Sequence, residues 1–375
     1  MDLHDLLAER TRKIEASGIR RVFDLAASLK DPIDLSIGQP DFDVPQDVKR
    51  AAHQAIDAGF NRYTPSAGWP EVRNRILDRF AGRHGVRPEA ALLTAGASGA
   101  LTLALLALLN PGDEVLTPDP FFVSYKHLAA MCGGVPVFYD TYPSWQIRIE
   151  ELERLAGPRT KAVLAMSPAN PTGACLADRL KSDLAAFARK RGLVLISDEI
   201  YEPFAYREDG ARSLASWYPE GTLVVGGLSK IAAMTGWRLG WALGPGWLIE
   251  QMVKLQQFTF VCAPSFAQKA VSAALDLDFA PTLAAYRSKR DRLVTGLRSA
   301  GYRVEEPAGA FYAFVEVPPR YPNGQAFVEE ALRRNLLCVP GQVFSRRDTH
   351  VRLSFAAPDE RLDAGLRVLA AMNGA

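Results

Sequence analysis

The sequence predicts an α/β protein in which a mostly parallel sheet is followed by a second, smaller α+β lobe. Over most of the first 280 residues, short apolar runs typical of buried strands alternate with helix-like segments. After about residue 280 the pattern changes to a long charged helix, two strands and a last helix. A chain of 375 residues, 48% of them apolar, is long enough for a large core and two lobes.

Five short apolar runs are predicted to be buried strands of the sheet. They are bounded by turn residues and have the length of strands rather than helices. These runs are Glu114–Pro118, Lys161–Met166, Leu193–Ile200, Thr222–Gly227 and Leu239–Gly244.

Helix-like segments precede and separate these strands. Residues Ser98–Asn110 end at the turn Pro111–Gly112, and residues Leu176–Gly192 end at their own glycine. In the smaller lobe we expect helices at Ala284–Gly301 and Pro358–Met372, and strands at Phe311–Val317 and Val351–Phe355.

Composition and charge narrow the classes of function. The formal net charge is +2 and no long Lys/Arg block occurs, so neither nucleic acid nor a membrane surface is an expected partner. The N-terminus has no apolar signal-peptide core, and no run of about 18 apolar residues is present, so we expect a cytoplasmic protein. Four cysteines, without a CxxC pair, and five scattered histidines predict no metal site.

Polar residues follow several of the predicted strands, where ligands of open α/β sheets bind. Asn170 follows one strand, Asp198 and Tyr201 end another, and Ser229 and Lys230 follow a third. The stretch Gly96–Gly99 precedes a helix and resembles a phosphate-binding turn, which would join the others at one edge of the sheet.

Each of these signals also has a simpler explanation. Asn170-Pro171-Thr172-Gly173 alone is a turn signal, and Asp198-Glu199 could be two solvated acids. The sequence "GASG" only approaches a hydrolase elbow, and "LGPG" at Leu243–Gly246 is an incomplete dinucleotide loop.

The segment "VVGGLSKIAAMTGWRLGW" contains two isolated cations, Lys230 and Arg238, and no carboxylate. Each cation must therefore reach solvent past apolar neighbours or meet an anionic partner from elsewhere.

Taken together and in order, the motifs resemble those of the class I/II aminotransferases, the pyridoxal-phosphate enzymes of fold type I. The matching motifs are "DPIDLSIGQPDFDVP", "YTPSAGWPEVR", "DPFFVSY", "NPTG", "SDEIYE", "LSKIAAMTGWRLGW", "PAGAFYAF" and "VRLSFA", which span nearly the whole chain. The resemblance implies a mixed seven-stranded sheet in a large domain at 46–280 and a small domain formed by both chain ends, 1–45 and 281–375. It also implies a homodimer with active sites at the interface, and it favours the aspartate and aromatic types.

The resemblance also implies roles for individual residues toward pyridoxal 5'-phosphate. Lys230 would form a Schiff base with the cofactor aldehyde and, once displaced by the substrate, would carry the proton. Asp198 would keep the pyridine nitrogen protonated, Tyr201 and Asn170 would bond the phenolic oxygen, and Phe122 would stack on the ring.

The remaining implied roles concern the phosphate and the substrate. Arg238, the Ser98 and Ser229 hydroxyls and the backbone N–H groups of Ala97 and Ser98 would hold the phosphate, and Tyr63 would reach the phosphate of the neighbouring subunit. Arg352 would bind the carboxylate of the amino acid and 2-oxo acid substrates, with Asn170 and the Gly38 backbone alongside.

Other functions stay open at this stage. A pyridoxal-phosphate β-lyase on the same fold would share Lys230, Asp198 and Arg352, and only its products distinguish it. A cofactor-binding regulator would carry an added DNA-binding domain, for which the matching region leaves no room, and a nicotinamide dehydrogenase would need an intact glycine fingerprint. Arg20 and Arg21 are candidates for binding an acidic substrate side chain.

Overall fold

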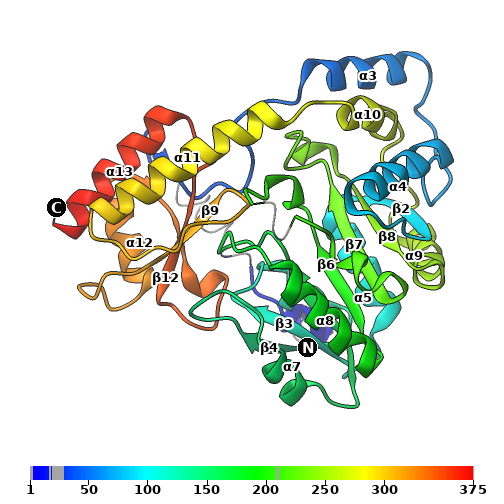
Figure 1. The fold of residues 1–375 in the computed structure, drawn as a ribbon, viewed down its shortest axis with the longest axis horizontal. Helices are drawn as coiled ribbons and strands as arrows, with labels where there is room; N and C mark the ends of the chain where they lie inside the picture. The colour runs from blue at the N-terminus through cyan, green and yellow to red at the C-terminus, as the bar shows by residue number, and fades with distance from the viewer. Residues whose placement is uncertain (1–2, 17, 19–28, 208–210, 375) are drawn as a thin grey trace.

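The computed structural model describes residues 3–16, 18, 29–207 and 211–374. A seven-stranded sheet forms the centre of the larger lobe, with strand order β2-β8-β7-β6-β5-β3-β4 (Figure 1). Strand β8 runs antiparallel to both of its neighbours, and the other pairings are parallel. The predicted mixed, mostly parallel sheet is therefore confirmed. Its strands are β2 (Ala90–Ala95), β3 (Glu114–Asp119), β4 (Val135–Asp140), β5 (Thr160–Met166), β6 (Val194–Asp198), β7 (Thr222–Gly227) and β8 (Leu239–Gly244).

Both faces of this sheet are buried, because successive side chains of a strand point to opposite faces. In β5, Leu164 and Met166 belong to one apolar core, whereas Val163 and Ala165 belong to a second. Buried residues of α5 belong to the first core, and buried residues of α8 belong to the second, so the two helices cover opposite faces of the sheet. The helices of this lobe are α3 (Gln46–Asp57), α4 (Pro70–His84), α5 (Gly96–Leu108), α6 (Ser124–Met131), α7 (Ile149–Leu155), α8 (Asp178–Arg191), α9 (Gly246–Thr259) and α10 (Ser265–Leu275).

The smaller lobe contains an antiparallel sheet of order β11-β12-β9, next to the long helix α11 and the last helix α13 (Figure 1). Near the N-terminus, β1 (Ile33–Asp34) pairs in parallel with β10 (Leu336–Leu337), so this early segment joins the C-terminal part of the chain. The other elements are α11 (Ala280–Ser299), β9 (Tyr312–Glu316), α12 (Gly324–Arg333), β11 (Val339–Pro340), β12 (His350–Ser354) and α13 (Asp359–Asn373).

Short helical turns complete the described chain. These are η1 (Leu3–Leu6), α1 (Glu9–Arg12), η2 (Glu202–Phe204), η3 (Leu214–Ser216), η4 (Pro219–Gly221), η5 (Thr235–Trp237) and η6 (Gly341–Val343). No helix within the described ranges is both long and apolar enough to cross a membrane. Over those same ranges, no group of three or more His, Cys, Asp or Glu side chains is placed to hold a metal ion.

Candidate active site

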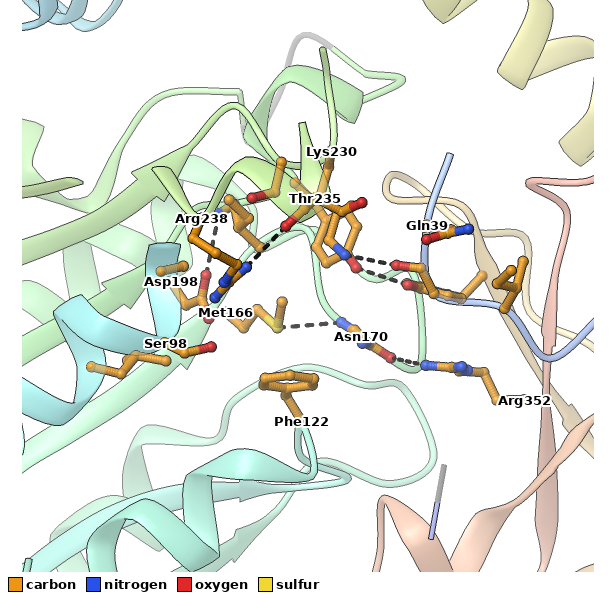
Figure 2. Close-up of a pocket in the computed structure, with 18 residues that line it drawn as sticks. Gln39, Ser98, Phe122, Met166, Asn170, Asp198, Lys230, Thr235, Arg238 and Arg352 are labelled. Carbon is orange, nitrogen blue, oxygen red and sulfur yellow. Dashed lines mark hydrogen bonds between the residues drawn. The ribbon is translucent and has the colours of Figure 1, made fainter. Parts of the chain in front are cut away.

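A cavity of about 340 Å³ lies at the carboxyl ends of β5, β6 and β7. In Figure 2, Asp198, Ser98 and Arg238 lie on one side of it and Arg352 on the other, with Lys230 and the Phe122 ring facing the space between. The parallel strands place these side chains together because their carboxyl ends meet at one edge of the sheet. The cavity is lined by Ile37, Gly38, Gln39, Ala97, Ser98, Leu101, Phe122, Met166, Asn170, Asp198, Ile200, Tyr201, Ser229, Lys230, Thr235, Arg238, Tyr312 and Arg352.

All of the site residues predicted from the sequence line this cavity except Tyr63. The Tyr63 side chain is 82% exposed and lies outside the cavity wall. Arg20 and Arg21, the candidates for an acidic side chain, fall outside the described residues.

Lys230 follows β7 and extends into the cavity, where its Nζ donates a hydrogen bond to the carbonyl oxygen of Gly38 at 2.7 Å. Burial, together with the nearby charge of Arg352, lowers the pKa of Lys230 to about 8. Near neutral pH, the unprotonated fraction of Lys230 is therefore larger than that of an ordinary lysine. The unprotonated amine can act as a nucleophile and as a base.

Asp198 is the last residue of β6 and is almost fully buried. Its Oδ2 accepts a hydrogen bond from the Tyr125 hydroxyl at 2.8 Å, and its Oδ1 accepts one from the Ile200 N–H at 3.2 Å. Burial raises the pKa of Asp198 to about 6 despite these two bonds. A cationic group held against this carboxylate would favour its ionised form.

Two buried tyrosines stand between Lys230 and Arg352. The hydroxyls of Tyr201 and Tyr312 are 2.8 Å apart and share a hydrogen bond. Burial raises the pKa of Tyr201, so its hydroxyl keeps its proton and can donate it to a ligand oxygen. The Tyr312 ring also packs against the Arg352 guanidinium, with 4.4 Å from Cζ to the ring centroid.

A cradle of hydrogen-bond donors, made by the first turn of α5 and Arg238, lies where α5 begins. The helix starts at Gly96, so the N–H groups of its first turn face the cavity beside the exposed Arg238. Nη1 and Nη2 of Arg238 donate to the carbonyl oxygens of Thr235 and Ala95 at 3.1 and 3.4 Å. Gly96 has a φ of +69°, which favours glycine, and a Cβ there would lie 2.6 Å from Nη2 of Arg238, so the guanidinium would have to shift.

Arg352, on β12, is a buried cation without a carboxylate partner in the described part of the chain. Its Nη1 donates to Oδ1 of Asn170 at 3.1 Å, and its Nη2 donates to the Ser36 carbonyl oxygen at 2.6 Å. Among the described residues, its Nε has no hydrogen-bond partner. A buried, partly unsatisfied guanidinium is costly, and an anion in the cavity would relieve that cost.

The structure adds residues that the sequence did not single out. Tyr125 holds Asp198, Tyr312 bonds Tyr201, and Gln39 and Thr235 face the cavity. Tyr125 and Tyr312 lie inside the recognised motifs "DPFFVSY" and "PAGAFYAF". Their contacts are with residues 73 and 111 positions away in the chain, which a motif alone does not specify.

Known proteins of one enzyme family match almost the whole chain. Residues 30–369 match the family described as aminotransferase class I and II. An aspartate aminotransferase of Pyrococcus abyssi (strain GE5 / Orsay) is 36% identical, and the match covers 96% of each chain. An aromatic-amino-acid aminotransferase 2 of Thermococcus litoralis (strain ATCC 51850 / DSM 5473 / JCM 8560 / NS-C) is 33% identical, again over 96% of each chain.

Solved structures of aminotransferases also match the fold of this chain. The structure of Thermus thermophilus aspartate aminotransferase with maleate superimposes with a TM-score of 0.93 at 35% identity, covering 97% of this chain and 99% of that one. Enzymes of this family depend on pyridoxal 5'-phosphate and share the fold type I architecture found here. The chain therefore belongs to the class I and II aminotransferases and is a pyridoxal-phosphate-dependent transaminase.

Proposed function

We propose that the cavity around Lys230 is where the amino group moves between an L-amino acid and a 2-oxo acid. The observation that carries this proposal is the placement of charge. One amine with a lowered pKa stands between a buried carboxylate, Asp198, and a buried guanidinium, Arg352. A cofactor with a basic ring nitrogen and a phosphate, joined to a substrate with a carboxylate, has charges that match these groups and the Arg238 cradle.

The residues present fit pyridoxal 5'-phosphate. Asp198 is placed to accept from a protonated ring nitrogen, and the first turn of α5 with Ser98, Ser229 and Arg238 suits the phosphate. Asn170 and the Tyr201 hydroxyl suit the phenolic oxygen, and the Phe122 ring faces the same space. When bound, the cofactor supplies an aldehyde that bonds to amino groups and a ring that withdraws electrons from the substrate α-carbon.

Lys230 would have two tasks. Its Nζ would hold the cofactor aldehyde before substrate arrives, and once free it would take the substrate α-proton and return it. A pKa of about 8 suits both steps, since the group can hold and release a proton near neutral pH.

Asp198 and Arg352 orient the reactants at opposite sides. Asp198 would accept the hydrogen bond of a protonated ring nitrogen, and that cation would keep Asp198 ionised. Arg352 binds the substrate α-carboxylate through its planar fork, while Asn170 and the Ser36 carbonyl fix the plane of the guanidinium. This fixes the α-carbon near Lys230.

A product analysis tests this assignment. Amino acids supplied with 2-oxoglutarate should give the matching 2-oxo acid and glutamate in equal amounts. The alternative on the same fold, a β-lyase, would instead give pyruvate and ammonia without an acceptor. The relatives are named aspartate and aromatic aminotransferases, so both substrate classes belong in the panel.

We further infer that two copies assemble with shared active sites. Several large apolar side chains are exposed in the loop after α3 and around the end of α9. Gln256 of α9 donates a hydrogen bond to the Ser66 carbonyl of that loop, which holds the two segments together. Large exposed apolar groups of this kind favour an interface. The exposed side chains are Phe60, Tyr63, Phe258, Phe260 and Val261.

The domain limits and the location of the protein are also proposals. The limits are 46–280 for the large domain and 1–45 with 281–375 for the small one. The pairing of β1 with β10 supports the joining of the two chain ends. A cytoplasmic location is proposed as well, and fractionation of cells would test it.

A further inference from the structure

The loop between β11 and β12 belongs to the smaller lobe but is bonded to the larger one. Phe344 in this loop packs against the Arg352 guanidinium, with 4.6 Å from Cζ to the ring centroid. The same ring lies in an apolar cluster with Tyr142 and Trp145, which come from the segment after β4. Phe344 is therefore one wall of the Arg352 site and also a contact between the lobes.

A buried polar network fixes this loop. Asp119, at the end of β3, accepts a hydrogen bond from the Ser345 hydroxyl at 2.6 Å and one from the Arg346 N–H at 3.3 Å. The Ser345 oxygen in turn accepts from the Tyr142 hydroxyl and from the Arg347 N–H, each at 3.0 Å. Ser345 thus uses one donor and two acceptor positions, which is all that a hydroxyl offers.

The network also reaches the cofactor side of the cavity. The Phe121 N–H donates to the Phe344 carbonyl oxygen at 2.6 Å. Phe121 directly precedes Phe122, whose ring faces the cavity (Figure 2). Residues 119–122 therefore connect Phe344, which packs against Arg352, with the Phe122 ring at the proposed cofactor position.

An ion pair near this network contributes less. Arg347 Nη2 lies 2.7 Å from Oδ2 of Asp140, but both side chains are partly exposed. Exposed ion pairs contribute little to stability, whereas hydrogen bonds to a buried carboxylate contribute more. Asp119 and Ser345 are both buried, with 6% and 4% of their surface exposed. They are the residues on which the position of the loop depends.

We propose that Asp119 and Ser345 form an inter-lobe clamp that positions Phe344 and Arg352 for binding the substrate carboxylate. The clamp rests on the proposed role of Arg352. Asp119 and Ser345 act through Phe344 and are positioning residues. Breaking the clamp should weaken binding of ligands that carry an α-carboxylate, and should spare both the cofactor and amines that lack the carboxylate.

The variant Ser345→Ala tests the clamp in the cofactor-loaded enzyme. The probes are the α-methyl form of the best amino-acid substrate, which has the carboxylate but no α-proton, and the corresponding amine without a carboxylate. Their binding is followed by the absorbance change of the cofactor. We expect roughly tenfold weaker binding of the α-methyl amino acid, as when about one hydrogen bond to a charged group is lost. Amine affinity and cofactor affinity should change less than about twofold, because the clamp contacts neither group directly.

Matched variants separate positioning from a general loss of stability. Ser213→Ala removes another buried serine hydroxyl that donates to a buried carboxylate, Glu199, at 2.7 Å, away from the clamp. It should leave both probes unaffected, and Ser345→Thr, which keeps a hydroxyl, should restore most of the carboxylate affinity. Asp119→Asn should weaken carboxylate binding in the same direction as Ser345→Ala.

Each outcome has one meaning. If Ser345→Ala binds the α-methyl amino acid as tightly as the wild type, or loses the amine to the same extent, the clamp does not position Arg352. If Arg352→Lys also leaves the α-methyl amino acid unaffected, the proposed role of Arg352 fails as well. If Arg352→Lys weakens binding of the α-methyl amino acid but Ser345→Ala does not, the clamp is overturned and the role of Arg352 stands.

Discussion

Replacement of Asp198 by alanine should separate holding the cofactor from using it. In the proposed binding mode the carboxylate is one buried contact to the ring, and the substitution leaves the cradle proposed for the phosphate intact. Loss of one charge-assisted hydrogen bond costs about 1.5–3 kcal/mol, so cofactor affinity should fall by about 10- to 150-fold. Turnover should fall further, by about two to three powers of ten at saturating cofactor, since a fixed charge that acts in the transition state is removed.

Titration with pyridoxal phosphate gives the affinity, and single-turnover conversion of an amino acid gives the rate. The pH dependence provides a second check. Because burial raises the pKa of Asp198 to about 6, protonation below that pH removes the negative partner, so wild-type cofactor affinity should weaken as the pH falls through 6. Asp198→Ala should lose this dependence. Tyr125→Phe, which keeps the charge, should retain it, and equal rates in Asp198→Ala and wild type would refute the assigned role.

Three further outcomes are expected. Lys230→Ala should fold, lose the visible absorbance of the attached cofactor and lose nearly all turnover; a borohydride-reducible adduct with normal rate in this variant would contradict the assignment. Arg352→Lys keeps the charge but loses the fork, so KM for every amino acid should rise by about tenfold or more while amines without a carboxylate are spared. Mixing inactive Tyr63→Ala and Lys230→Ala chains should restore activity, because one site of each heterodimer then carries both native residues; no recovery in proven heterodimers would place Tyr63 outside the partner's site.

The central strands could be predicted from the sequence, but two of the sheet strands could not. Strands β5 to β8 are apolar runs bounded by turn residues, which is a strong local signal. Strand β2 runs directly into α5 at Gly96, so no loop separates its apolar residues from those of the helix. Strand β4 contains Pro136, which argues against a strand, yet β4 is the edge of the sheet, where proline is tolerated.

The residues of the candidate site were predicted from sequence motifs. The contacts between residues far apart in the chain could not be predicted in this way. Asp198 ends a strand, and Asn170 and Lys230 follow strands, so the sheet topology brings the three together. Tyr125 lies on α6, and no local pattern indicates that its hydroxyl reaches Asp198. Packing of whole elements decides such contacts, and a single sequence carries no direct signal for them.

The short stretch Ser36–Gly38 supports both functional cations with its backbone. The Ser36 carbonyl holds Arg352, and the Gly38 carbonyl holds Lys230. Between them, the Ile37 side chain lines the cavity without taking part in either bond. These two contacts use main-chain atoms that every residue type possesses. A substitution at position 37 would therefore reshape the cavity wall while both contacts to the cations stay in place.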